Sequence, residues 1–262
     1  MNKYLKYFKI GFLQSTEYKS SIILSFVSPF IIAVFFYFVW GYLYSLSDGL
    51  IGGFTFKEMI FYLIFGLLIH TIRSSELAEK ICEEVKSGDI AIYLCRPVSF
   101  VKSVFAKGFG ERIVQIVMVF IALIVITLVA NLPIPNIQTL GILVIYLILF
   151  IIFDIILYSI IGAFSFWFTE IWGIRRAVEH IQLVLTGRIL PLSLFPLWFS
   201  SILKFTPFYY MEYSFASIYL GKFTMIQAIF GVGMLLLWIF ILLVILLIVY
   251  KIGFKKLEAL GG

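Results

Sequence analysis

Polar and ionisable side chains recur inside three apolar stretches, at spacings that place them along one side of a helix. The three series are Tyr62, Gly66, His70 and Arg73; Asp154, Tyr158, Gly162 and Ser165; and Arg175, Glu179, Gln182 and Thr186. In an apolar environment such groups mark a solute path or a proton relay. We expect a path or a seam between two chains to be lined by Tyr62, His70, Asp154, Tyr158, Gln182 and Thr186. The alternative is that these residues pack the helices of one bundle together.

Asp154 is the acid that we expect to lie deepest among apolar residues. A charged side chain at the centre of a bilayer is costly, so Asp154 should face the interior of the protein, protonated or bonded to a tyrosine. The sequence offers no second buried carboxylate on a neighbouring stretch. A proton relay through Asp154 is therefore not favoured.

Residues with spacings that support catalysis are scarce. Glu83 and Glu84 are adjacent, as in some intramembrane proteases, and His70 or His180 might be expected to join them. An arginine four positions beyond Glu84 is missing, however, and neither a Gly-x-Ser-x-Gly elbow nor a His-Glu-x-x-His motif occurs. We expect no catalytic residue in this chain.

Motifs for nucleotides and metals are also missing. The glycine-rich stretch Gly49 to Gly53 is followed by Phe54 without the lysine that a phosphate-binding loop requires. Cys82 and Cys95, with two histidines in the chain, supply too few ligands for a zinc site. We expect no metal, no cofactor and no nucleic acid to be bound by this chain, and we expect the cysteines to act as small apolar residues.

The composition indicates whether the protein is surrounded by water or by lipid. Hydrophobic residues make up 63% of the chain, charged residues 13%, and the mean hydropathy is +1.10, which leaves too little polar surface for a water-soluble protein. A helix of about 20 residues crosses a bilayer core of about 30 Å. The apolar stretches are continuous, unlike the alternating strands of a membrane barrel. The sequence predicts an all-α integral membrane protein, residues 1–262 forming one domain with six spans: Ser21 to Tyr44, Phe56 to Ile72, Ile113 to Ala130, Leu140 to Phe168, Ala177 to Phe195 and Met225 to Tyr250.

The placement of Lys and Arg predicts the orientation, because basic residues near span ends stay on the cytoplasmic side. With both termini cytoplasmic, most of the basic residues lie inside. We expect a multi-pass protein of the plasma membrane of a bacterium or archaeon, in contact with membrane lipids.

Two segments outside the spans have their own character. Residues 1–20 combine lysines with Leu5, Phe8 and Phe12 at helical spacing, which predicts an amphipathic helix lying on the membrane surface. Residues 191–222 are apolar but interrupted by prolines, and interrupted backbone at membrane depth must be covered by protein or line a wet cavity. We expect short re-entrant or extracellular helices there, before the last span.

The connection over residues 73–112 is basic, long and cytoplasmic in this topology. From Glu76 to Lys86, the apolar residues Leu77, Ile81 and Val85 recur every fourth position among charged residues, which predicts an amphipathic helix below the membrane. Gly88 is a typical helix ending. We expect the apolar ridge to lie against the membrane or in a groove of another protein. Replacing Ile81 by Asp should then leave folding intact.

The stretch ICEEVKSGDIAIYLCRPVS, residues 81–99, resembles the cytoplasmic signature of the membrane subunits of type 2 ABC transporters. Glu84, Gly88, Leu94, Pro97 and Ser99 carry the match. The sequence departs from the commonest form at Asp89, Ile90 and Arg96, and in this it is similar to a subgroup often encoded as paired permeases.

The resemblance implies a permease that pairs with a second copy or a related permease and with two separate ATPase subunits, which carry ATP and Mg²⁺. The helix after the second span is the coupling helix in that family. Carried over, Leu77, Ile81, Glu84, Val85, Gly88 and Pro97 would transmit motion from the ATPase. The implied function is ATP-driven transport, outward by analogy. An ATP-independent secondary transporter or channel stays open as the alternative.

Overall fold

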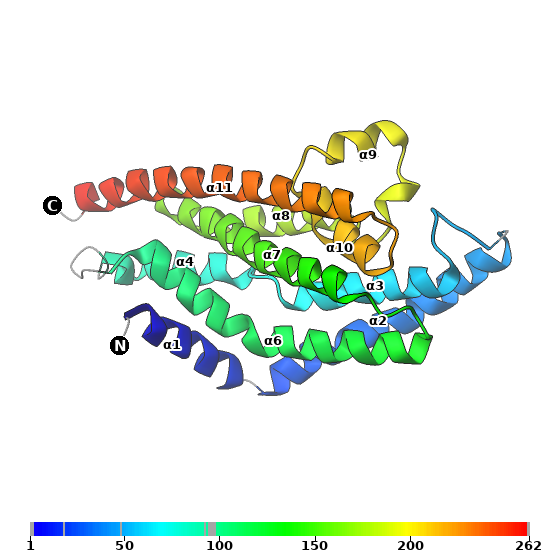
Figure 1. The fold of residues 1–262 in the computed structure, drawn as a ribbon. Coiled ribbons are helices and arrows are strands. Elements are labelled where there is room, and N and C mark those ends of the chain that lie inside the picture. Colours follow the sequence, from blue (N-terminus) through cyan, green and yellow to red (C-terminus); the bar gives the residue numbers. More distant parts are fainter. Residues whose placement is uncertain (1–2, 18, 48, 92, 94–97, 261–262) are drawn as a thin grey trace.

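The computed structural model describes residues 3–17, 19–47, 49–91, 93 and 98–260. Within these ranges the chain is all-helical, and the only β feature is an isolated bridge between Ile51 and Phe54. Figure 1 shows long helices packed side by side with their axes roughly aligned. Helix α1 begins and α11 ends at the same end of this bundle, which is the geometry expected if both termini lie on one side of a membrane.

Among the residues that the structure describes, five segments are long and apolar enough to cross a membrane: Val27–Ser45, Phe56–Lys86, Phe100–Ala130, Ile137–Phe166 and Met225–Lys256. They are built from α2 (Lys19–Ser45), α3 (Phe56–Thr71) with α4 (Glu76–Lys86), α6 (Phe100–Ala130), α7 (Ile137–Ala163) with the 3-10 turn η2 (Phe164–Phe166), and α11 (Met225–Leu260). These five correspond to the first, second, third, fourth and sixth predicted spans.

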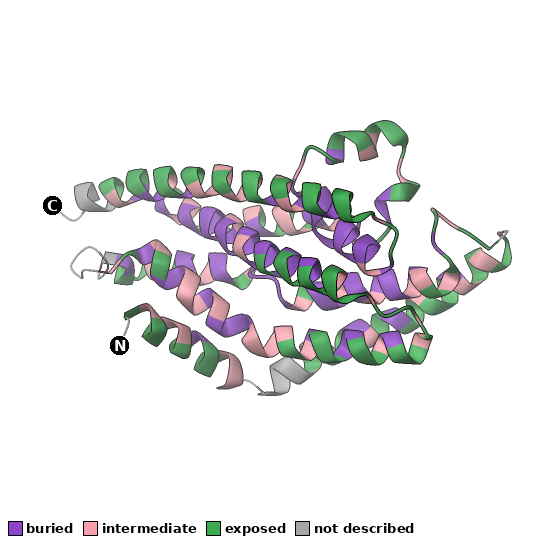
Figure 2. Cartoon of the chain, in the orientation of Figure 1, coloured by how far each residue is buried: buried purple, intermediate pink, exposed green. Residues whose placement is uncertain are grey.

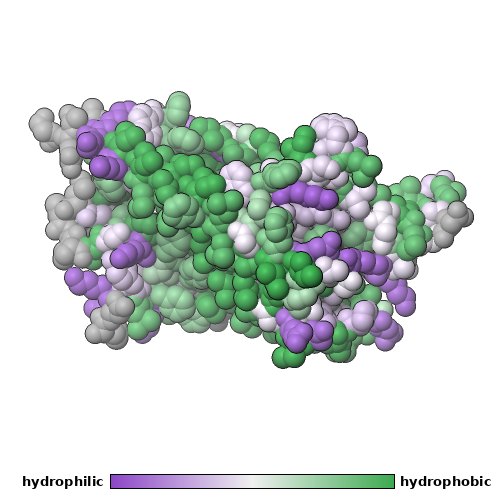
Figure 3. Space-filling model, turned by 45° about the horizontal axis from the view of Figure 1, so that its top comes forward, coloured by the Kyte–Doolittle hydropathy of each residue, from purple (hydrophilic) through white to green (hydrophobic). Residues whose placement is uncertain are grey.

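Helix α7 lies at the centre of the molecule and α11 lies at its surface. Figure 2 shows the second half of α7 buried, whereas α11 is exposed along most of its length. Most exposed side chains of α11 are aliphatic or aromatic, for example Ile226, Phe240 and Leu247. Figure 3 shows such side chains forming a continuous apolar area on one face. Apolar surface of this extent requires lipid or protein contact.

The predicted fifth span, Ala177 to Phe195, is wrong as a continuous helix. Helix α8 covers Trp172–Leu185, 14 residues that rise about 21 Å, which is less than the bilayer core. It ends because Gly187 adopts a positive φ of 75° and the chain then turns at Pro191. Short helices follow, as predicted for residues 191–222: η3 (Leu192–Leu194), α9 (Leu197–Leu203), η4 (Phe208–Tyr210) and α10 (Glu212–Tyr219).

Helix α10 returns to the end of α8. The backbone N–H of Tyr213 donates to the carbonyl of Thr186 over 3.2 Å, so α10 begins where α8 stops. The eight residues of α10 add about 12 Å of helix. Helices α8 and α10 thus meet in space, although residues 186–211 separate them in the sequence.

Helix α4 also departs from the expectation, because its apolar ridge already has a partner within the chain. It packs along α7, burying Leu77 and Ile81. The contact is close at Gly162, where an added Cβ would lie 2.8 Å from Cβ of Ile81. The ridge is therefore covered in this structure, and the charged Ile81→Asp substitution is expected to disrupt folding.

Helix α1 (Lys3–Glu17) packs against α6 by a close crossing of two glycines. Gly11 lies against the backbone of Lys107, and Gly110 lies against the backbone of Phe8, so neither position has room for a side chain. The opposite side of α1 exposes apolar residues such as Leu5 and Leu13. The structure thus has a helix over Lys3–Glu17, while the amphipathic role predicted for residues 1–20 on the membrane surface stays a prediction.

Candidate functional site

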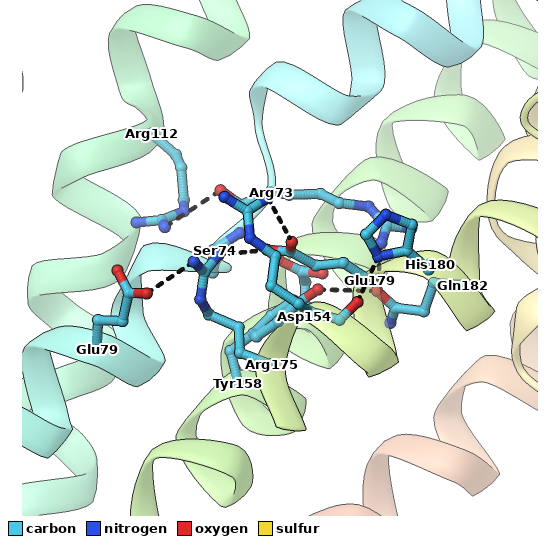
Figure 4. Close-up of polar contacts among 11 residues, drawn as sticks. Arg73, Ser74, Glu79, Arg112, Asp154, Tyr158, Arg175, Glu179, His180 and Gln182 are labelled. Carbon is cyan, nitrogen blue, oxygen red and sulfur yellow. Dashed lines mark hydrogen bonds and ion pairs between the residues drawn. The ribbon is translucent and has the colours of Figure 1, made fainter. Parts of the chain in front are cut away.

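The two interruptions of the bundle lie next to each other. One separates α3 from α4 and contains Arg73 and Ser74, and the other separates α8 from α10. Around them the structure gathers buried polar side chains, which we name the polar junction: Arg73, Ser74, Asp154, Tyr158, Gln182, Thr186 and Glu212. Figure 4 shows Arg73, Ser74, Asp154, Tyr158 and Gln182 gathered from the α3–α4 interruption, α7 and α8.

Arg73 occupies the centre of the polar junction. Its Nη2 forms an ion pair with Oε1 of Glu212 over 3.2 Å, and its Nη1 donates to Oε1 of Gln182. Its guanidinium carbon lies 5.9 Å from the ring centroid of Phe150, a cation–π contact. The side chains of Arg73 and Glu212 are only 3% and 1% exposed, so this pair is removed from water. The arginine thereby joins the α3–α4 interruption to the α8–α10 interruption.

Hydroxyl groups add further hydrogen bonds around this pair, although Nε of Arg73 has no hydrogen-bond partner among the described residues. Thr186 donates to Oε2 of Glu212 over 2.5 Å, so both carboxylate oxygens are engaged. Tyr158 donates to Oε1 of Gln182 over 2.9 Å. Buried polar groups in apolar surroundings are stable only when paired in this way.

Asp154 stabilises the start of α4. Its Oδ2 accepts a hydrogen bond from the backbone N–H of Ser74, just before the helix begins. The side chain of Ser75 makes no capping hydrogen bond, so a carboxylate from α7 acts near the positive end of the helix dipole. Asp154 thus ties the central helix α7 to α4. Its second oxygen, Oδ1, has no hydrogen-bond partner among the described residues.

Charges in and next to the polar junction are balanced. Arg112 donates to Oε2 of Glu111 over 3.0 Å and reaches the carbonyl of Arg73 at 3.4 Å, while Lys80 pairs with Glu111 over 3.0 Å. The positive groups are therefore Arg73, Lys80 and Arg112, and the negative groups are Glu111, Asp154 and Glu212. This balance explains how so many ionisable groups are kept in an apolar bundle.

A cavity of about 790 Å³ reaches the polar junction, and the last residues of α1 help to line it. It is bounded by α1, α4 and α6, and both Arg73 and Arg112 line it. Its other lining side chains are mostly charged, including Glu17, Glu84 and Lys107. The cavity therefore offers water or polar solutes a route to the arginines from one end of the bundle.

The structure brings together most of the predicted path residues. Asp154, Tyr158, Gln182 and Thr186 belong to the polar junction, and Tyr62 donates nearby to the carbonyl of Gly187. His70 differs, because it is exposed on the surface of α3.

Glu212 is the residue that the sequence reasoning missed. We expected Asp154 to be the only deep acid, but Glu212 is 2% exposed and lies in the bundle. The signal available in the sequence was that Glu212 is the only acid within residues 191–222, surrounded by aromatic and small residues. Its partner Arg73, assigned to the edge of a cytoplasmic loop, is buried as well.

The predicted coupling residues do not form one surface. Leu77 and Ile81 are buried, Glu84 and Val85 are half-buried, and Gly88 is exposed with a positive φ of 81°. Pro97 lies outside the described residues. The exposed end of this segment comprises Glu83, Lys86, Ser87, Gly88 and Asp89.

Comparisons with known proteins give one family. The model of the ABC-2 family transporter protein matches residues 22–261, nearly the whole chain. A search of curated proteins finds no match. The family match covers the helices that form the polar junction, and it agrees with the apolar helices of the fold. The chain therefore belongs to the ABC-2 family of membrane transporter proteins.

Proposed function

We propose that this chain is the permease subunit of an ATP-driven ABC exporter, paired with a second copy or a related permease and with a separate ATPase dimer. Membership of the ABC-2 family carries this proposal, since its members are membrane components and not ATPases themselves. The chain is placed in the plasma membrane with both termini in the cytoplasm. ATP and Mg²⁺ act on the partner ATPase.

The polar junction supplies a physical route for coupling. A push on the exposed end of α4 acts on a helix that is held to α7 by Asp154 and to the α8–α10 pair by Arg73. Displacement of α4 is thereby transmitted to both interruptions of the bundle. The surface that receives the push is the exposed end of α4 and not the apolar ridge, because the ridge is buried against α7.

Coupling is tested with an ABC ATPase encoded by a neighbouring gene. The two proteins are purified together and ATP hydrolysis is compared with that of the ATPase alone. We expect charge reversal of two exposed residues, Glu83→Arg with Asp89→Arg, to abolish most of the permease-dependent hydrolysis. Lys57→Glu, an exposed change at the opposite end of α3, is the matched control and should leave hydrolysis unchanged. Equal hydrolysis in all three would refute coupling at this surface.

One observation supports the alternative that this chain is an ATP-independent transporter. Asp154 and Glu212 are two buried carboxylates on neighbouring elements, as a proton-coupled transporter requires. Uptake or release that persists in membranes without the ATPase, driven by a proton gradient, would favour this second function. Glu212 is engaged by Arg73 and Thr186, which favours a structural ion pair and the ATP-driven proposal.

A further inference from the structure

Arg188 lies near the polar junction but is not one of the paired charged residues described above. Arg188 follows directly after Gly187, where α8 has ended, and its side chain lies against α3. A Cβ added to Gly66 would lie 3.0 Å from Cγ of Arg188 and 3.2 Å from its carbonyl oxygen. Gly66 is thus the residue that allows this arginine to lie on the surface of α3.

Arg188 is half-exposed and forms no hydrogen bond or ion pair with any residue that the structure describes. The nearest acid of the junction, Glu212, is unavailable because Arg73 and Thr186 occupy its two oxygens. An arginine side chain does not lose its proton in proteins. A permanent positive charge without a partner, next to an apolar bundle, requires an anion or water.

The surroundings of Arg188 combine exposed aliphatic side chains with the imidazole of His70. Ile181 and Val184, 54% and 45% exposed, lie in the last two turns of α8, which ends at Leu185, three positions before Arg188. His70, one helical turn beyond Gly66 on α3, is exposed as well. The only acid of α8 is Glu179, and it is already paired with Arg175 and Arg176. This surface therefore combines an aliphatic strip with uncompensated positive charge.

We propose that Arg188, assisted by His70, binds the carboxylate or phosphate group of a transported amphiphile whose apolar chain lies along Ile181 and Val184. This inference rests on the proposed function and adds to it that this side of α3 and α8 lies on the transport path. It accounts for the lone charge, because a second copy of the chain facing this surface would add a like charge and not a counter-ion. A neutral or cationic amphiphile would leave Arg188 without a partner.

Binding is tested on the permease alone, in nanodiscs of phosphatidylcholine, with three probes of equal chain length: dodecyl phosphate, dodecanol and dodecyltrimethylammonium. We expect saturable binding of dodecyl phosphate that the other two do not displace. Arg188→Gln should weaken it at least tenfold, whereas Arg188→Lys should weaken it much less. Lys204→Gln, an exposed change on another segment, is the control and should have no effect.

A further variant keeps the test informative if Arg188→Gln does not fold. Val184→Glu adds an acid at the end of α8, four positions before Arg188, where it should offer an internal partner and weaken the binding of dodecyl phosphate. Equal binding of the three probes, or wild-type affinity in a folded Arg188→Gln protein, would overturn the proposal.

Two additional measurements are needed. One distinguishes a resident lipid from a transported ligand, and the other distinguishes failure of the anion site from failure of the proposed transport function. Displacement of dodecyl phosphate by phosphatidylglycerol, with no movement of dodecyl phosphate across proteoliposomes that contain the ATPase, would identify a resident lipid and refute a transported ligand. Arg188-dependent binding in a chain that fails to stimulate any ATPase would refute the proposed function while leaving the anion site in place.

Discussion

The ion pair between Arg73 and Glu212 should contribute strongly to the stability of the fold. Replacing either residue by Met removes one partner and leaves the other charge buried, since the two side chains are 3% and 1% exposed. Breaking a buried ion pair in this way costs about 3–5 kcal/mol. Each single variant also loses a satellite hydrogen bond, from Arg73 to Gln182 or from Thr186 to Glu212, worth about 1 kcal/mol.

The double variant Arg73→Met with Glu212→Met should be less destabilised than the sum of the single variants. It leaves no unpaired charge, so it loses only the satellite hydrogen bonds and some packing, about 2–3 kcal/mol. The coupling free energy between the two sites should therefore be at least about 5 kcal/mol, which is several thousandfold in the equilibrium constant. Unfolding by sodium dodecyl sulfate in mixed micelles, followed by circular dichroism, measures these quantities.

The exposed ion pair between Lys86 and Glu170 provides the matched control. Its side chains are 39% and 76% exposed, and its atoms lie 2.7 Å apart, closer than those of the buried pair. Surface pairs contribute little because water screens them, so we expect no measurable coupling there. A coupling at Arg73 and Glu212 that is as small as at the exposed pair would refute the view that burial makes this contact important.

Three further variants test the packing around the polar junction. Gly162→Leu should destabilise the protein by about 1–3 kcal/mol, because its side chain would collide with Ile81, as the same unfolding assay can show. Gly110→Val should detach α1 from α6, which increased hydrogen exchange of the α1 amides would report. Tyr62→Phe should cost about 1–3 kcal/mol, because the carbonyl of Gly187 loses its buried donor, and it should speed exchange near the end of α8.

Each of these variants has a matched control in the chain. Gly141→Leu on α7 and Gly233→Val on α11 add side chains where no heavy atom lies within 4 Å, so both should be tolerated. Tyr42→Phe removes a hydroxyl from a side chain that is 67% exposed. Test variants that behave like their controls would show that the close packing described for α1, α4 and α8 is wrong.

The sequence by itself determined the class of the protein and its long helices. Composition and continuous apolar stretches depend only on local residue content, and they correctly predicted α2, α6, α7 and α11 within a few residues at most ends. The signature over residues 81–99 led to the family that the match over residues 22–261 shows. The end of α4 at a glycine and the interruption by prolines before α11 could also be predicted from the sequence, because Gly and Pro determine the backbone conformation locally.

Only the tertiary structure decided which surfaces meet. The fifth span ends at Leu185 and its continuation, α10, begins 27 positions later at Glu212. The same folding back places Glu212 against Arg73, residues 139 positions apart. The ridge of α4 was predicted correctly as apolar but assigned the wrong partner. Periodicity shows that a helix has an apolar side, but the surface that covers it depends on contacts between distant segments, and those contacts exist only once the chain has folded.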